Sequence, residues 1–286
     1  MVMPSITKTM TKAQIEALRE RIEPQALSVT RPPYTYFQMK LPSLTITAYQ
    51  SGKVVYQGQD VSFLEPSESS RDEETFPQAG SDEVGTGDYF GPVVVAACIV
   101  SAQAAPRLRA LGIQDSKQMD DTRIRAIAPE VKSLCPYSLM IVSNPKYNAI
   151  HARHNMNAIK SLLHNQAYLN LMDKGHELPA LCVVDQFAKP AVYYRHLEGQ
   201  PRVVRNLTFE TKAENKYLAV ACASVLARAA FLDYFDKMAA KYDFPFEKGA
   251  GPKVDQCGRR FVERYGFEKL GEVAKMHFKN TEKIRS

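Results

Sequence analysis

Residues 78–100 read QAGSDEVGTGDYFGPVVVAACIV, and the interpretation of the whole chain starts from them. The uninterrupted apolar run 93–100 is rich in valine and follows a Gly-Pro pair, which predicts a strand buried on both faces. Two adjacent carboxylates, Asp82 and Glu83, come shortly before this run, and no lysine or arginine lies near them in the sequence. Because a carboxylate at the edge of a core is costly unless a positive charge meets it, this stretch indicates a bound divalent cation.

Composition and charge narrow the class of protein. A chain of 286 residues that is 45% hydrophobic can form one large or two modest domains. Its net charge of +6 fits an anionic partner, but many soluble enzymes are equally basic. The five cysteines are widely spaced without a C-x-x-C pair, which argues against a zinc site or a disulfide scaffold. We find neither a signal-peptide pattern nor an apolar run of membrane-spanning length, so we expect a cytoplasmic protein without a membrane partner. We also expect a monomer.

Residues 1–62 predict a small α+β domain. Thr11 can cap a helix that ends at Ile22, and three strands follow in an antiparallel meander, at 34–41, 44–49 and 54–56. Tyrosines and phenylalanines alternate with lysines on these strands. Such a face can bind nucleic acid, or the aromatic rings can simply pack beneath the helix, and the pattern alone leaves both interpretations open.

Residues 63–78 are polar, acidic and bounded by prolines, which predicts a linker. Residues 79–286 then alternate between strand and helix patterns, so we expect an α/β domain whose mixed sheet has helices on its faces. The expected strands are at 93–100, 138–142 and 181–184, with a weaker signal at 203–204. The expected helices are at 120–132, 147–172 and 215–237, and the last of these is alanine-rich.

Acidic residues recur at the ends of these expected elements. Asp185 ends the strand at 181–184, and Glu214 stands at the start of the alanine-rich helix, where the helix dipole favours a negative charge. If they meet Asp82 and Glu83, the four carboxylates form an oxygen-only site of the kind that Mg²⁺ or Mn²⁺ prefers. Each has a plainer explanation: a surface acidic pair, an aspartate that caps a turn, and an ordinary glutamate in a first helical turn.

The motifs together resemble those of the type 2 ribonucleases H. The stretch GSDEVGTGDYFGPVVVAA, residues 80–97, resembles the family's first motif, and its Gly-Thr-Gly-Asp-Tyr-Phe segment resembles the ribonuclease HIII branch. Three further segments match: Asp115-Ser116-Lys117, Val183-Val184-Asp185, and Lys212-Ala213-Glu214 followed by the alanine-rich helix. The resemblance runs from about residue 79 to the C-terminus. Residues 1–62 fit the extra substrate-binding domain of this branch, which is similar to the TATA-binding protein.

The resemblance implies a ribonuclease H-like catalytic domain and a specific chemistry. The expected reaction is endonucleolytic hydrolysis of the RNA strand of an RNA–DNA hybrid, which leaves 5′-phosphate and 3′-hydroxyl ends. Two ions, Mg²⁺ or Mn²⁺, would bind to Asp82, Asp185 and Glu214, with Glu83 as a further ligand, partly through its backbone carbonyl.

The resemblance also assigns substrate-binding residues. Gly85, Thr86 and Gly87 would bring backbone groups to the minor groove, where 2′-hydroxyls distinguish RNA from DNA. Ser116 and Lys117 would bind phosphate, although a capped, solvated turn explains the same two residues.

Two departures from the wider family bear on the subtype. Ribonuclease HII usually has Gly-Arg-Gly where this chain has Gly-Thr-Gly, and an aspartate where this chain has Glu214. Both favour the HIII branch. The alternatives are an HII-like enzyme that cuts at single embedded ribonucleotides, and a hybrid-binding protein without catalysis. The presence of all four carboxylates argues against the second.

Three further features keep two interpretations each. His151 and His154 are ordinary polar-face histidines or contacts to nucleic acid. Asn155 and Asn157 cap a helix or contact the nucleic acid backbone. The net basic segment 241–286 binds phosphates or is simply a charged amphipathic helix with a tail.

Overall fold

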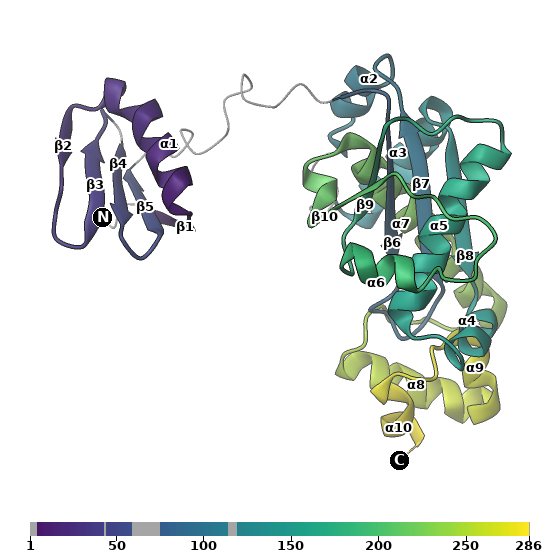
Figure 1. The fold of residues 1–286 in the computed structure, drawn as a ribbon. Coiled ribbons are helices and arrows are strands. Elements are labelled where there is room, and N and C mark those ends of the chain that lie inside the picture. Colours follow the sequence, from purple (N-terminus) through teal and green to yellow (C-terminus); the bar gives the residue numbers. More distant parts are fainter. Residues whose placement is uncertain (1–4, 43, 59–74, 114–118, 286) are drawn as a thin grey trace. The chain divides into compact units, whose positions relative to one another are not determined.

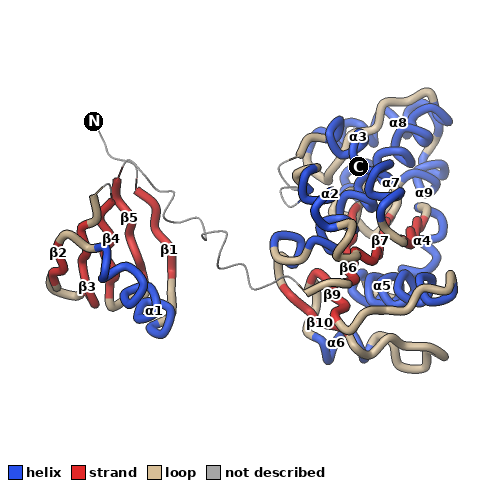
Figure 2. Tube along the Cα trace, turned by 90° about the horizontal axis from the view of Figure 1, so that it is seen from above, coloured by secondary structure: helices blue, strands red, loops and turns tan. Residues whose placement is uncertain are grey.

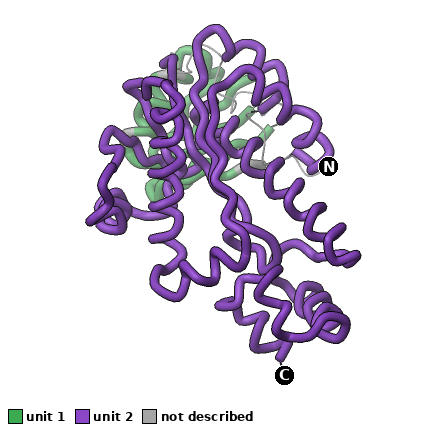
Figure 3. The backbone as a smooth tube through the Cα atoms, turned by 90° about the vertical axis from the view of Figure 1, so that its right-hand side faces the viewer, with its two compact units in different colours: residues 1–74 green, residues 75–286 purple. Residues whose placement is uncertain are grey.

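The computed structural model describes residues 5–42, 44–58, 75–113 and 119–285. The chain divides into two compact units, Met1–Glu74 and Thr75–Ser286 (Figure 3). The predicted residues Ser116 and Lys117, and most of the predicted linker, lie outside the described residues.

The first unit is a five-stranded antiparallel sheet with one long helix against it (Figure 2). The strand order is β1-β5-β4-β3-β2. Its elements are β1 (Ser5–Thr9), α1 (Lys12–Ile22), the 3-10 helix η1 (Glu23–Gln25), β2 (Ser28–Thr30), β3 (Thr35–Lys40), β4 (Leu44–Tyr49) and β5 (Lys53–Gly58). One face of α1 contributes Ile15, Leu18 and Ile22 to a core with the inward residues of the sheet, among them Phe37, Ile46 and Tyr56.

The sequence located most of this unit. The predicted helix is confirmed, and Thr11 caps it with a capping box that includes Gln14. The predicted strand 44–49 matches β4 exactly. The edge strands β1 and β2 were missed because they are short and polar and leave little apolar periodicity to detect.

The second unit is built on a mixed five-stranded sheet with the order β10-β9-β6-β7-β8. β6 pairs antiparallel with β7, which pairs antiparallel with β8, whereas β6–β9 and β9–β10 are parallel pairs. The strands are β6 (Gln78–Val84), β7 (Val93–Val100), β8 (Tyr137–Val142), β9 (Leu181–Asp185) and β10 (Leu207–Glu210). This arrangement confirms the predicted mixed sheet.

Helices cover both faces of this sheet (Figures 1 and 2). On one face, Val94, Ala96 and Cys98 of β7 join a core with the long helix α7, and on the other Val93 and Val95 join a core with α5. β7 is therefore buried on both faces, as its apolar run predicts. The helices are α2 (Ala105–Ala110), α3 (Asp121–Leu134), α4 (Asn144–His151), α5 (Met156–Asp173), α6 (Pro190–Arg195), the 3-10 helix η5 (Ala213–Asn215), α7 (Leu218–Tyr242), α8 (Pro252–Tyr265), the 3-10 helix η6 (Phe267–Lys269), α9 (Leu270–Val273) and α10 (Lys279–Arg285).

Two local predictions were wrong, and one strand was missed. The segment 147–172 is not one helix, because α4 ends at His151 and Asn155 caps α5 by accepting a hydrogen bond from the Ala158 N–H. The weak strand signal at 203–204 does not correspond to a strand, since β10 begins at Leu207. Asp82 and Glu83 precede β7, as predicted, but they themselves lie within a further strand, β6, which was missed because its glycine, serine and acidic residues mask it.

The expectation that no segment is long and apolar enough to cross a bilayer was also wrong. α7 meets that test by length and composition, with a mean hydropathy of 1.6 over its most apolar 18 residues. However, 78% of that window is buried inside the protein. α7 therefore has the burial of a core helix.

Candidate active site

Asp82 and Asp185 occupy adjacent positions at the C-terminal ends of two parallel strands. The register pairs Ser81 of β6 with Val184 of β9, so the next residue on each strand is one of the two aspartates. Asp82 is 7% exposed and Asp185 is half-buried. The carboxyl ends of parallel strands are where α/β proteins commonly place their sites.

Glu214 reaches the same place from the segment between β10 and α7. It lies in the 3-10 helix η5 and is 1% exposed. The backbone N–H of Ala213, its neighbour, donates a hydrogen bond to Oδ1 of Asp185 at 3.0 Å. This bond ties the start of η5 to the end of β9, so the chain brings Asp82, Asp185 and Glu214 into one region.

Close packing of α7 on β6 fixes one wall of this region. A Cβ atom on Gly80 would lie 2.3 Å from the backbone nitrogen of Val220, so only glycine lets the helix backbone approach this closely. The side chain of Gln78 accepts a hydrogen bond from the Ala219 N–H at 3.0 Å. One turn further along α7, the hydroxyl of Ser224 hydrogen bonds to Asp82. The small residues of α7 therefore place a polar group directly at the carboxylate.

The electrostatics of Asp82 are those of a crowded anionic site. Burial, together with the negative charges of Glu83 and Asp185, raises the pKa of Asp82 to about 7, against the opposing hydrogen bonds from Ser224 and the Glu83 backbone. Since like charges held together in a buried place oppose ionisation, a cation would stabilise the charged form. An oxygen-only donor set of this kind fits a hard divalent ion.

The predicted ligands do not yet form a complete metal site. Among the residues that the structure describes, no three His, Cys, Asp or Glu side chains are close enough to hold an ion together. The carboxylate of Glu83 is engaged elsewhere, because each of its oxygens has a partner on α5.

Glu83 is held by two residues of α5. Lys160 Nζ lies 2.5 Å from one carboxylate oxygen, and His164 Nε2 lies 2.9 Å from the other. The second ring nitrogen of His164 contacts the hydroxyl of Ser81 at 2.8 Å, and the Lys160 ammonium lies 4.0 Å from the ring centroid of Phe187. Burial by itself would raise the pKa of Glu83, but His164 and Lys160 together lower it below its usual value.

Sequence analysis missed these partners. It sought a positive charge near Glu83 along the chain, whereas Lys160 is 77 residues away and is brought to β6 by the packing of α5 on the sheet. An apolar helix face that carries a lysine and a histidine four residues apart was the available signal.

Replacing Lys160 with methionine should destabilise the metal-free protein by about 3 kcal/mol, because it leaves the buried Glu83 carboxylate with less compensation. Glu83→Gln in the same chain should restore most of the loss. The control is Lys216→Met, which removes an exposed partner of Glu210 and should cost less than about 1 kcal/mol. Urea unfolding monitored by circular dichroism measures the free energy of unfolding of the three variants. Equal losses of stability in Lys160→Met and Lys216→Met would contradict the role of Lys160 as the buried partner of Glu83.

The predicted substrate-binding glycines form a turn directly after β6. Gly85 has φ +87°, and a Cβ atom there would lie 2.2 Å from the carbonyl oxygen of Pro92, so the turn requires glycine. Gly87 is exposed, with no neighbouring atom within 4 Å of an added Cβ, and Thr86 is half-buried. The structure thus places Gly87 on an open surface next to the carboxylates.

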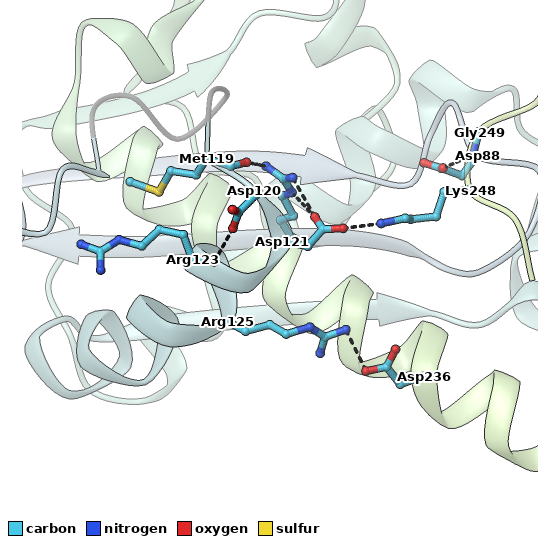
Figure 4. A network of polar contacts seen from close by, with 10 residues as sticks. Asp88, Met119, Asp120, Asp121, Arg123, Arg125, Asp236, Lys248 and Gly249 are labelled. Carbon is cyan, nitrogen blue, oxygen red and sulfur yellow. Dashed lines mark hydrogen bonds and ion pairs between the residues drawn. The ribbon is translucent and has the colours of Figure 1, made fainter.

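A polar network anchors the region beside this turn (Figure 4). Arg228 of α7 donates to Oδ1 of Asp121 at 2.7 and 3.0 Å and to the Met119 carbonyl at 2.9 Å, and Lys248 pairs with the same aspartate. Asp88 Oδ1 accepts a hydrogen bond from the Gly249 N–H at 2.6 Å. The network fixes Met119–Asp121, the first described residues after Ser116 and Lys117.

The remaining candidates lie on the surface. His154 is exposed, whereas His151 stacks on His277 with ring centroids 3.9 Å apart. Of the two asparagines, Asn155 is a helix cap. The basic C-terminal segment forms α8, α9 and α10, and its role stays a prediction.

Comparisons with known proteins find matches to both units of the chain. The family model described as Ribonuclease HII matches residues 79–281, and a domain of unknown function, DUF3378, matches residues 5–64. The ribonuclease HIII of Bacillus pumilus is 38% identical, covering 97% of this chain and 98% of its own. The ribonuclease HIII of Bacillus mycoides is 40% identical, covering 98% of this chain and 97% of its own.

Solved structures of ribonucleases HIII and HII also match this chain. The crystal structure of Bst-RNase HIII in complex with Mn²⁺ matches with a TM-score of 0.73 and 33% identity, over 99% of this chain and 98% of that one. Ribonuclease HII of Archaeoglobus fulgidus, solved in a complex with PCNA, matches with a TM-score of 0.61 and 26% identity, over 73% of this chain and 97% of that one.

Proposed function

This chain belongs to the ribonuclease HIII family, and we propose that it hydrolyses the RNA strand of RNA–DNA hybrids, leaving 5′-phosphate and 3′-hydroxyl ends. The observation that carries the proposal is the adjacency of Asp82 and Asp185 at the ends of β6 and β9, with η5, which carries Glu214, tied to Asp185 by the Ala213 N–H. These three carboxylates come from separate segments, and burial, with the negative charges of Glu83 and Asp185, raises the pKa of Asp82 to about 7.

We propose that Asp82, Asp185 and Glu214 hold two divalent ions, Mg²⁺ or Mn²⁺. Such ions activate water and neutralise the charge that develops on the leaving oxygen. The carboxylate of Glu83 would have to leave Lys160 and His164 to become a ligand. Its main role in this proposal is therefore that of a buried, neutralised anion that fixes the end of β6, while its backbone stays next to the ligands.

The Gly85-Thr86-Gly87 turn would contact the minor groove of the hybrid. Exposed backbone at Gly87 allows close approach, and the 2′-hydroxyls displayed in that groove distinguish RNA from DNA. Ser116 and Lys117 remain proposed phosphate ligands.

We propose that the open face of the N-terminal sheet binds nucleic acid. α1 covers one face, and the outward residues on the other are almost all polar or basic. None of these outward residues among the described positions is acidic: Thr7, Thr9, Gln38, Lys40, Thr45, Thr47, Tyr49, Lys53, Val55 and Gln57. Gln38 Nε2 donates to Thr47 Oγ1 at 3.0 Å, which fixes the half-buried Gln38 side chain on this face.

Reversing the two lysines of this face, Lys40→Glu with Lys53→Glu, should weaken hybrid binding about tenfold or more at low salt while kcat at saturating substrate stays nearly unchanged. The control is Lys12→Glu with Lys8→Ala, because neither of these lysines lies on the open face. Fluorescence anisotropy with a labelled hybrid measures the affinity. Equal affinities for the two double variants would refute the assignment of this face.

The direct test of the proposed function compares two labelled substrates. The protein should cut a continuous RNA–DNA hybrid at many positions in Mg²⁺ or Mn²⁺, and a chelator should stop it. Preferential cutting of a DNA duplex with one embedded ribonucleotide would instead indicate an HII-like enzyme. Binding without cutting at any metal concentration would indicate a non-catalytic hybrid-binding protein.

We further propose a monomer in the cytoplasm, without a membrane partner. All five cysteines lie among the described residues, are buried and form no disulfide, which supports a reducing compartment.

A further inference from the structure

Lys275 is a fully buried lysine that the mechanism above does not use. It lies just after α9 and is 0% exposed. Its Nζ donates to two backbone carbonyls, that of Asp88 at 2.7 Å and that of Gly91 at 2.6 Å. Both carbonyls belong to the loop that begins with Gly85-Thr86-Gly87, so the lysine joins the C-terminal segment to the proposed substrate-binding turn.

Backbone contacts make the same connection. The Lys275 N–H donates to the Tyr89 carbonyl at 2.9 Å, and the Gly91 N–H donates to the Val273 carbonyl at 3.0 Å. Phe90 and Ala274 form an isolated antiparallel bridge between them. These bonds hold residues 89–91, whereas the lysine side chain reaches further toward the glycines by binding the Asp88 carbonyl.

Packing does not explain an amine at this position. A buried lysine is costly, and burial lowers the pKa of Lys275 to about 7 against the opposing charge of Asp88. Among the described residues no carboxylate forms an ion pair with it, and Asp88 directs its own side chain to the Gly249 N–H. A methionine would fill the same space at no such cost. What the amine adds is donors for two loop carbonyls, and even a neutral amine has two N–H groups for them.

We propose that Lys275 is a positioning residue, which holds the 85–91 loop in the conformation that presents Gly85, Thr86 and Gly87 to the hybrid. This inference rests on the proposed function of that turn. It makes the C-terminal segment, some 190 residues away in sequence, a part of substrate recognition without contact to the substrate.

The test uses the full-length protein with Lys275→Met. Its matched control is Lys174→Met, which removes a lysine that also donates to a backbone carbonyl, that of Tyr137, at 2.7 Å. Loss of two buried hydrogen bonds should speed amide exchange in peptides covering 85–91 and raise the hybrid Kd in Ca²⁺ about tenfold, with kcat falling less than about threefold. The control should change neither. Unchanged exchange and unchanged Kd in Lys275→Met, with or without lower thermal stability, would overturn the inference.

A second variant keeps the test decisive if Lys275→Met fails to fold. Asn144 Nδ2 donates to the same Gly91 carbonyl at 2.8 Å, so Asn144→Ala weakens the anchor while the amine stays. It should give smaller changes in the same direction, about threefold in Kd. Wild-type exchange and affinity in Asn144→Ala would then contradict the inference.

The two claims can fail separately. If the wild-type protein does not bind hybrid, the proposed function fails, whereas faster exchange at 85–91 in the Lys275 variant still establishes the anchor.

Discussion

Replacing Asp82 with asparagine is expected to abolish cleavage of an RNA–DNA hybrid, with a fall in kcat of about 10³-fold or more. Asparagine keeps the shape of the side chain, and its Oδ1 can still accept the hydrogen bond that Asp82 receives from the Glu83 N–H at 2.7 Å. What it removes is the negative charge that would hold an ion next to Asp185. The variant should therefore still fold and bind hybrid with nearly unchanged affinity, because neither the fold nor the proposed hybrid contacts require that charge.

The assay is a gel of a labelled hybrid at saturating protein, with affinity measured separately by anisotropy. The control is Asp173→Asn, which makes the same chemical change at an exposed aspartate that pairs with Arg202. Cleavage by Asp82→Asn at a rate near that of the control would remove Asp82 from the reaction.

The same substitution should raise the stability of the metal-free protein. The folded-state pKa of Asp82 is about 7 against an ordinary value of 3.8, which corresponds to about 4 kcal/mol of unfavourable ionisation. Between those two values the folded protein retains a proton that the unfolded chain has released. The free energy of unfolding contributed by this group therefore falls as the pH rises from about 4 to about 7, and it stays low above that range.

Asp82→Asn has no such group, so its advantage over the wild type should grow across that pH range and approach about 4 kcal/mol at pH 8 without metal. Urea unfolding in chelator at several pH values measures the difference. Mn²⁺ should narrow it, because an ion that binds only the folded wild type stabilises that protein. A difference that is constant from pH 4 to pH 8 would show that Asp82 is not held in an anionic cluster.

The fold was largely predictable where one residue pattern dominates. The valine-rich run of β7, the capped helix α1 and the alternation of β4 were each recognised with nearly correct ends. β6 was missed because its sequence, QAGSDEV, mixes small, polar and acidic residues, and Gly80 is required by the close approach of α7. The break between α4 and α5 was missed because the segment across it, residues 151–155 (HARHN), contains no glycine or proline to mark the end of a helix.

The sequence proposes the members of the candidate site, but it does not indicate which other residues contact them. Positions at the ends of expected elements, together with the family resemblance, singled out Asp82, Asp185 and Glu214. The structure shows which residues lie around them. The pairing of Glu83 with Lys160 and His164, and the reach of Lys275 to the Asp88 carbonyl, depend on packing between distant segments. No local pattern encodes such contacts, because helix and strand periodicity determines which face is buried and not which partner meets it.

The account depends on ions held by carboxylates from three separate segments. A crystal of the protein grown with Mn²⁺ and measured at the manganese absorption edge tests this directly. The account predicts anomalous peaks within bonding distance of carboxylate oxygens of both Asp82 and Asp185, with Glu214 beside them. Manganese bound only elsewhere, or no peak at these side chains at saturating Mn²⁺, would contradict it.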